Sequence, residues 1–426
     1  MLDFLKTILI FLEVLLLFNL LILVHELGHF FAARWRGLVA DKFAIWFGHP
    51  LWSKKINGVE YRLGWIPAGG FVSIPQMAPM EVIEGKSVSQ NLPPAKPSDK
   101  IIVALAGPLA SLALAILFAL LVWILGRPVS ESELTTRIGY VVPDGPAHKA
   151  GLQPGDLILT VDGTPVSRFA SLGNVEKSIV WNIAESQAPQ IPITVERNGK
   201  ILTFWVAPQT PERQGFGRKG LRQIGIAPAM TLRVARVFRN SPASQAGIQP
   251  GDLIHAVNNI PLLSLPALAD FLDSYGGGPI TLLIERKGSK FPLTLTPQIP
   301  EGGDKPRIGI EWDTRGKTIL IHPTPWEQIL GTFQTIWSTI VAVASPHNQI
   351  GLQHLSGPVG IMRFYYMIFE APDGWLVALW FSVFLNINLA ILNLLPLPVL
   401  DGGHILLAIL EAIRKRPFSQ RSLEIL

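Results

Sequence analysis

Cysteine is absent from this chain of 426 residues, and charged side chains are scarce, at 16%. Without cysteine the chain can form neither disulfide bonds nor thiolate metal sites, so any bound metal must be held by histidine and carboxylate side chains. The scarcity of charge accompanies 49% hydrophobic residues and a mean hydropathy of +0.36. Ordinary soluble proteins carry about a quarter charged residues, so this composition predicts a membrane protein.

Three apolar windows are long enough to cross a bilayer, which requires about 20 residues of helix. The first is unusual because it meets His25 and Glu26 while its pattern still predicts helix to about Ala33. A cleaved signal peptide is the alternative for this window, but it has no basic n-region beyond Lys6 and no small-residue cleavage site before Val24. The expected fold is a polytopic α-helical membrane protein, with spans at Ile8–Val24, Ile101–Leu125 and Trp375–Leu395.

Lysine and arginine are concentrated in two regions that flank the spans, 34–100 and 414–421. Because basic residues beside spans face the cytoplasm, these regions are expected on the cytoplasmic side of a bacterial inner membrane. The long segment 127–373 is then expected in the periplasm. The net charge of +5 is explained by membrane orientation, so the lipid bilayer is an expected partner and nucleic acid is not.

The long segment contains an internal repeat. Residues 146–158 read PAHKAGLQPGDLI, and residues 242–254 read PASQAGIQPGDLI. Each copy precedes a tight turn, a helical stretch and two alternating strands, which meet at Asn198-Gly199 or at Lys287-Gly288. Two homologous β-rich domains are expected, each introduced by an apolar-glycine-apolar run, at 138–140 and at 224–226, and joined by a linker at 209–220.

Aromatic residues at helical intervals in 325–345 predict an amphipathic helix, which either lies on the membrane surface or supports the fold from within. The expected domains are the first span, 1–33; a cytoplasmic loop, 34–99; the second span, 100–126; two β-rich domains, 127–209 and 221–300; a region with the amphipathic helix, 301–373; and the third span with a C-terminal helix, 374–426.

His25-Glu26-Leu27-Gly28-His29 is an H-E-x-x-H motif at the end of the first span. Residues i and i+4 share one face of a helix, so both imidazoles can reach one metal ion, and the intervening glutamate lies close enough to activate water. Polar groups at membrane depth are costly and usually face a cavity or a partner. The alternative is structural, with the two histidines capping the end of a span at the interface.

A third ligand is required, because a catalytic zinc usually takes three protein ligands. Asp401 is the candidate, since Pro396 and Pro398 must stop the third helix before it and Gly402-Gly403 allows close approach of another backbone. This aspartate is expected on the same side of the membrane as the two histidines. A plain Asp-Gly turn is the alternative, and His404 is a chemically reasonable competing ligand.

The sequence resembles known proteins at two levels. The A-G-[LI]-Q-P-G-D-L-I core of each repeat resembles the PDZ domains of bacterial proteases, which implies either peptide binding by strand addition or a rigid cap that binds no peptide. The arrangement of H-E-x-x-H, PDZ-like repeats and a late Leu-Asp-Gly resembles the site-2 protease family of intramembrane zinc metalloproteases. This resemblance implies Zn²⁺ held by His25, His29 and Asp401, with Glu26 as the general base. It also implies four spans, so a further span after Leu426 is expected.

The segment 59–74 predicts two short strands around a Pro/Gly bend, apolar enough to enter the membrane and therefore expected beside the metal. The family resemblance implies a membrane re-entrant β-hairpin whose edge, with Gly69, Gly70 and Phe71, holds substrate as an added strand, while Asn393 contacts the substrate backbone. The implied substrate is a single-span membrane protein, such as an anti-sigma factor already cut by another protease. Alternatives are an inactive PDZ scaffold that binds periplasmic protein tails and a metal transporter.

Overall fold

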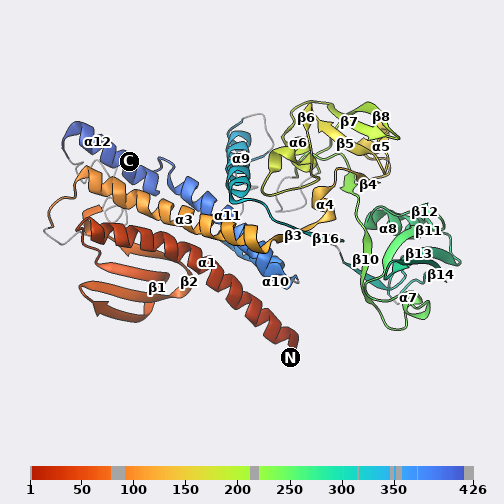
Figure 1. Ribbon diagram of the computed structural model, residues 1–426, viewed down its shortest axis with the longest axis horizontal. Coiled ribbons are helices and arrows are strands. Elements are labelled where there is room, and N and C mark those ends of the chain that lie inside the picture. The colour runs from red at the N-terminus through yellow and green to blue at the C-terminus, as the bar shows by residue number, and fades with distance from the viewer. Residues whose placement is uncertain are drawn as a thin grey trace. The chain divides into compact units, whose positions relative to one another are not determined.

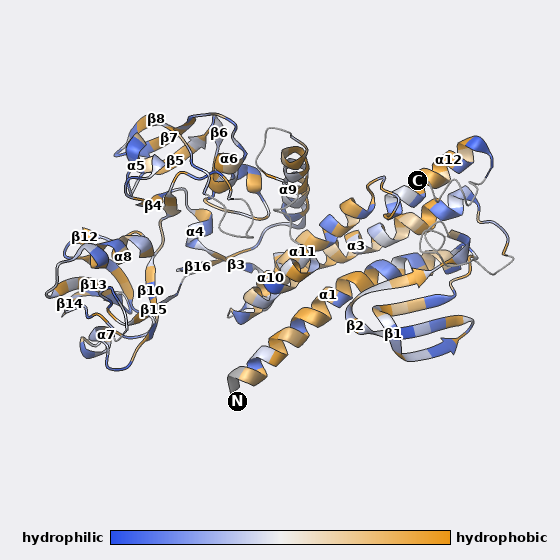
Figure 2. Ribbon diagram, turned by 180° about the vertical axis from the view of Figure 1, so that it is seen from behind, coloured by the Kyte–Doolittle hydropathy of each residue, from blue (hydrophilic) through white to orange (hydrophobic). Residues whose placement is uncertain are grey.

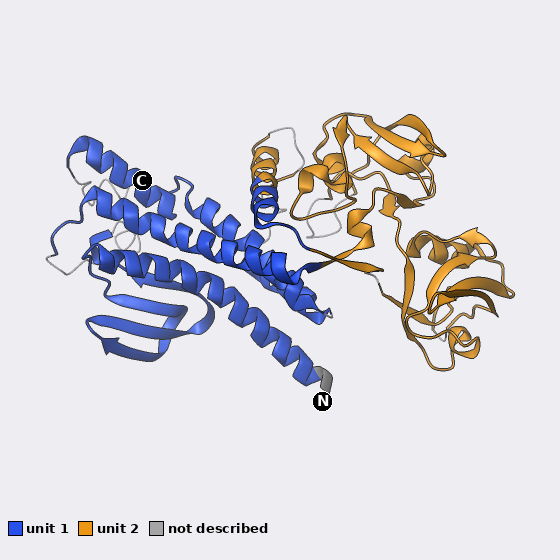
Figure 3. Cartoon of the chain, viewed as in Figure 1, with its two compact units in different colours: residues 1–127, 322–333, 356–426 blue, residues 128–321, 334–355 orange. Residues whose placement is uncertain are grey.

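The computed structural model describes residues 2–77, 92–211, 220–300, 302–313, 316–345, 350–351, 357–371 and 373–416. The chain divides into two compact units (Figure 3). The helical unit comprises residues 1–127, 322–333 and 356–426, and the inserted unit comprises residues 128–321 and 334–355. Residues 212–219 of the expected linker at 209–220 lie outside the described residues.

Long apolar helices form the helical unit (Figures 1 and 2). Within the described part of the chain, three helices are long and apolar enough to cross a membrane, and they coincide with the three expected spans. The third ends at Asn393, just before the two prolines that were expected to stop it. Helix α3 packs against the other two spans and against α12. The helices of this unit are α1 (Leu2–Trp35), α3 (Pro97–Leu125), α10 (Pro358–Glu370), α11 (Gly374–Asn393) and α12 (Asp401–Arg414).

A β-hairpin lies against α1 (Figure 1), and it differs from the expected one. It is formed by β1 (Lys42–Ile56) and β2 (Val59–Ser73), which meet at a tight turn where Asn57 and Gly58 both have positive φ. The expectation of two strands within 59–74 around the Pro/Gly bend is confirmed in part: the chain does turn back at that bend, but the bend lies inside β2, and the segments on either side of it pair with β1 and not with each other. The two strands fold back so that residues 42–45 pair with both 60–63 and 70–73.

Two β-rich repeats make up most of the inserted unit, and their hairpins turn at the two expected positions. In each repeat a fully buried aspartate at the end of the repeated motif pairs with an arginine of the hairpin, Asp156 with Arg197 and Asp252 with Arg286. The first repeat contains β4 (Ile138–Val141), α5 (Pro146–Ala150), β5 (Leu157–Val161), β6 (Thr164–Pro165), α6 (Ile179–Glu185), β7 (Ile191–Arg197) and β8 (Lys200–Val206). The second contains β10 (Leu232–Val237), α7 (Pro242–Gln245), β11 (Leu253–Val257), β12 (Ile260–Pro261), α8 (Leu265–Ser274), β13 (Ile280–Arg286) and β14 (Ser289–Leu295).

The apolar-glycine-apolar run at 224–226 belongs to the first repeat and not, as expected, to the second. Strand β9 (Ile226–Pro228) pairs with β4, and Ile224 is buried in the core of the first repeat. The matching element of the second repeat is β15 (Ile310–Asp313), which pairs with β10 and follows the buried Ile308. In each repeat, therefore, the strand that pairs with the first strand comes after the hairpin in sequence. Which repeat such a strand belongs to is decided by its pairing and not by the repeat it lies next to in the sequence.

Short elements and one long helix complete the chain. The amphipathic helix expected at 325–345 is present as α9, with polar Gln328 and Thr332 buried and aromatic Trp326 and Trp337 largely exposed, at 66% and 60%. The remaining elements are β3 (Arg127–Ser130), which pairs with β16 (Thr318–Ile321), α4 (Glu131–Leu134), α9 (Pro325–Ala344) and two 3-10 turns at Pro75–Met77 and Val175–Lys177.

Candidate metal centre

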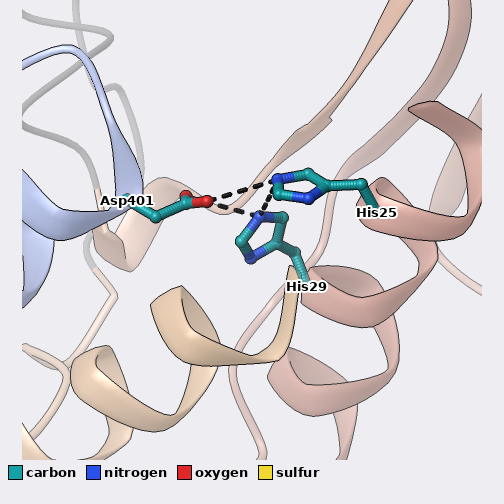
Figure 4. Close-up of side chains that lie close together, drawn as sticks. All are labelled: His25, His29 and Asp401. Atoms are coloured by element: carbon teal, nitrogen blue, oxygen red, sulfur yellow. Dashed lines mark hydrogen bonds and ion pairs between the residues drawn. The ribbon is translucent and has the colours of Figure 1, made fainter. Parts of the chain in front are cut away.

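The two histidines of the motif lie on one face of α1. This helix contains no proline, and its only glycine is Gly28, so the i, i+4 geometry of the motif is preserved. The rings of His25 and His29 are 4.9 Å apart between centroids and nearly perpendicular. Their Nε2 atoms approach to 3.2 Å, and both point toward the start of α12 (Figure 4).

Helix α3 holds both imidazoles through their other ring nitrogen. His29 Nδ1 is 2.8 Å from the carbonyl oxygen of Val103, and His25 Nδ1 is 3.0 Å from Ser111 Oγ. A carbonyl only accepts, so His29 carries its proton on Nδ1 and presents the Nε2 lone pair. Such partners orient metal-binding histidines in known sites. Neither contact was predicted from the sequence.

A glycine in α3 makes room for this arrangement. A Cβ placed on Gly107 would lie 2.1 Å from His29 Nε2. On the facing helix, a Cβ on Gly28 would lie 2.4 Å from the carbonyl oxygen of Ala106. Both distances are too short for real contacts, so close packing of α1 on α3 depends on glycine at both positions.

Asp401 completes the group from a distant part of the chain. It is the first residue of α12, and its two carboxylate oxygens lie 3.2 Å from His25 Nε2 and 3.4 Å from His29 Nε2. The expected role of the glycine pair is confirmed, because Cβ atoms on Gly402 and Gly403 would lie 2.2–2.3 Å from carbonyl oxygens of 394–397. Two ion pairs stabilise this end of the helical unit. Lys100 of α3 pairs with Glu411 of α12, and Arg36, which follows α1, pairs with Asp99 of α3.

These three side chains fit a metal ion. One ligand atom from each of His25, His29 and Asp401 lies within 4.8 Å of the others. Two imidazoles with their second nitrogens already engaged, together with one carboxylate, form a donor set typical of catalytic zinc sites. His404, the competing candidate, is not a member of this group.

The other expected site residues lie at different distances from the group. The amide of Asn393 donates to His25 Nε2 at 3.2 Å. The Glu26 carboxylate accepts a hydrogen bond from the backbone of Val72 in β2, and a Cβ on Gly70 would lie 3.7 Å from Glu26 Cγ. The remaining two, Gly69 and Phe71, contact the ring of Phe47 within the hairpin.

Comparisons with known proteins agree with this site. Over 95% of this chain and 92% of the relative, it is 32% identical to a protein of Neisseria meningitidis whose name assigns it to the zinc metalloproteases. It is 31% identical to the regulator of sigma-E protease RseP of Salmonella typhimurium, over 95% of this chain and 90% of the relative. A PDZ domain of an SdrC-like protein from Listeria monocytogenes covers 20% of this chain and 93% of its own, at 20% identity and a TM-score of 0.18, too low to support an argument.

The helices, the H-E-x-x-H motif and the carboxylate define the class, a membrane metalloprotease of the site-2 type that uses zinc. The chain belongs to peptidase family M50, whose family model matches residues 13–426. It is a protein of the bacterial inner membrane, as its apolar helices and its relatives indicate.

Proposed function

We propose that this enzyme cleaves single-span membrane proteins within their transmembrane segments, with zinc held by His25, His29 and Asp401. The observation that carries the proposal is the convergence of these side chains at the ends of apolar helices, with Glu26 beside both the histidines and the edge of a β-hairpin. A protease that acts inside the membrane requires its catalytic groups in such a place.

Each residue of the site then has a distinct task. Zinc, when bound, supplies Lewis acidity to the scissile carbonyl and to the attacking water. Glu26 accepts the proton of that water and delivers it to the leaving amine, while the backbone N–H of Val72 holds its carboxylate in place. Ser111 and Val103 keep the imidazoles oriented. Asn393, which already reaches His25, donates to the substrate backbone.

The substrate segment is proposed to bind in an extended form. A transmembrane helix buries its amides in internal hydrogen bonds, so it must unwind locally before a peptide bond can be hydrolysed. Gly70 and Phe71 of β2 pair with Ile45 and Ala44 on one side, and the other side of this edge is proposed to take up the segment as an added strand. Exposed apolar residues on the hairpin, including Leu51, Trp52 and Trp65, support the proposal that it re-enters the membrane.

The inserted unit is proposed to act as a filter on the periplasmic side. Its two repeats are proposed to be PDZ domains, and a substrate with a large periplasmic domain would have to pass them. An anti-sigma factor already shortened by another protease is the proposed substrate, supported by relatives named as regulators of sigma-E. The exposed tryptophans of α9 are proposed to rest on the membrane surface beside it.

Replacing Glu26 with glutamine tests the function. The Glu26→Gln variant is expected to abolish cleavage of a single-span reporter in membranes while keeping stoichiometric zinc, because glutamine cannot accept the proton and the metal ligands are untouched. Glu13→Gln, an exposed position on the same helix, serves as the matched control and should remain active. If the reporter were still cleaved at the original rate in the presence of Glu26→Gln, the protein would not be the protease, and an inactive PDZ scaffold would be the better explanation of its function.

A further inference from the structure

The backbone of β1 contains an outlier at Trp46. Its φ of +68° lies in the left-handed region, which glycine occupies freely and which a bulky side chain occupies only at a cost in free energy. The register of the hairpin shifts at this point, between Ile45 and Phe47. A tryptophan at such a bend indicates that its side chain makes a compensating interaction.

The indole of Trp46 makes that interaction with the first span. Its Nε1–H donates to Asn19 Oδ1 of α1 at 2.8 Å. The amide nitrogen of Asn19 donates to the carbonyl of Leu15 in its own helix at 2.7 Å, which fixes the amide with its oxygen toward the hairpin. An amide in an apolar span is costly unless it is hydrogen-bonded, so the bond also stabilises Asn19.

Trp46 stands between two residues that shape the edge of the hairpin. Ile45, before it, pairs with Gly70. The ring of Phe47, after it, is stacked on that of Phe71 with a centroid distance of 6.4 Å. The position of Trp46 relative to α1 therefore sets the position of the edge that is proposed to receive the substrate.

Asn19 and Glu26 lie on the same face of α1. They are seven residues apart, which is two helical turns and about 10 Å. The hairpin contacts this face through Trp46 at one position and through the Val72 backbone at the other. Two attachments on one face fix both the distance and the tilt of the edge relative to Glu26.

We infer that the hydrogen bond between Asn19 and Trp46 is a latch that holds the hairpin edge in register with the catalytic glutamate. Both are positioning residues, and the inference rests on the proposed function of the edge. Without the latch, only a fraction of molecules presents the edge correctly at any time. The apparent affinity for substrate falls with that fraction, while turnover of bound substrate is unchanged.

Steady-state kinetics on a single-span reporter test the latch. Trp46→Phe removes the donor and Asn19→Leu removes the acceptor, and each is expected to raise KM about fivefold, as expected for one ordinary hydrogen bond, with kcat and zinc content kept. The double variant should raise KM no further, since both changes remove the same bond. Trp52→Phe, at an exposed tryptophan of the same strand, is the matched control and should leave KM unchanged.

A second measurement does not depend on proteolysis. Val59 of the hairpin is 3% exposed and belongs to a buried cluster with Phe30 of α1. Because the chain lacks cysteine, Val59→Cys introduces a single thiol, and its rate of maleimide labelling reports separation of the hairpin from α1. Asn19→Leu and Trp46→Phe should each increase that rate about fivefold. Trp46→Gly, which also relieves the backbone strain, should do the same.

The outcomes separate the latch from the proposed function. If the enzyme proved inactive on membrane segments, faster labelling in the latch variants would still support the latch. Unchanged labelling would overturn it, even in a fully active protease. Additive effects in the double variant, or faster labelling with unchanged KM in an active enzyme, would also overturn it.

Discussion

Replacing Ser111 with alanine is expected to weaken zinc binding without disturbing the fold of the helices. His25 and Ser111 are 6% and 0% exposed, and their hydrogen bond of 3.0 Å joins α1 to α3. Ser111→Ala leaves one ring nitrogen of a buried imidazole unpaired, which costs about 1–3 kcal/mol. That cost corresponds to roughly a 5- to 150-fold loss of zinc affinity, which includes the range of about 10- to 100-fold known for partners of metal-binding histidines.

The assay is competition for zinc between the purified protein and a chelator of known affinity. Ser111→Thr keeps a hydroxyl and should bind zinc within a few-fold of the original protein. Ser382→Ala is the matched control, because Ser382 is equally buried in α11 but bonds to Tyr365, away from the metal group. If Ser111→Ala and Ser382→Ala bound zinc equally well, the reasoning about His25 would be refuted.

Two further predictions concern close packing and the repeats. Gly107→Ala should lower zinc content sharply, because its Cβ would lie 2.1 Å from His29 Nε2; full zinc occupancy, measured by mass spectrometry, would contradict this. Asp156→Asn should destabilise the first repeat by about 2 kcal/mol, since it replaces the carboxylate that accepts two hydrogen bonds from Arg197 with a neutral amide. Amide hydrogen exchange in Asp156→Asn should become faster in the first repeat alone, and in Asp252→Asn in the second repeat alone. If either variant sped up exchange equally in both repeats, the two ion pairs would not be independent.

The metal-binding residues could be predicted from the sequence because most of their arrangement follows from local structure. H-E-x-x-H sets two side chains by helix geometry, and two prolines followed by glycines mark the break at which Asp401 appears. The contacts of Val103 and Ser111 were not accessible in the same way. They depend on the rotation of α3 against α1, and a backbone carbonyl that accepts a hydrogen bond has no sequence signature.

The errors concern strand pairing, which is non-local. Asn57-Gly58 is a strong signal for a hairpin turn and marks the turn between β1 and β2, which the predicted strands around the bend at 67–70 did not include. The run at 224–226 directly precedes the second repeat in sequence, yet its strand completes the first. The similar run at 308–310, which ends the second repeat, was the available clue.

The support of both histidines by a single helix limits where the enzyme can open. Val103, Gly107 and Ser111 are spaced by four residues, so they form one row along α3 that matches the row of His29 and His25 on α1. A slip of α3 by one turn, about 5.4 Å, would place Gly107, which has no hydroxyl, where Ser111 bonds to His25. We therefore expect α1 and α3 to behave as one rigid body during catalysis. Admission of a substrate then falls to the parts outside this row of contacts, namely the hairpin, which packs on α1 through the cluster around Phe30, and α12, which packs on α3.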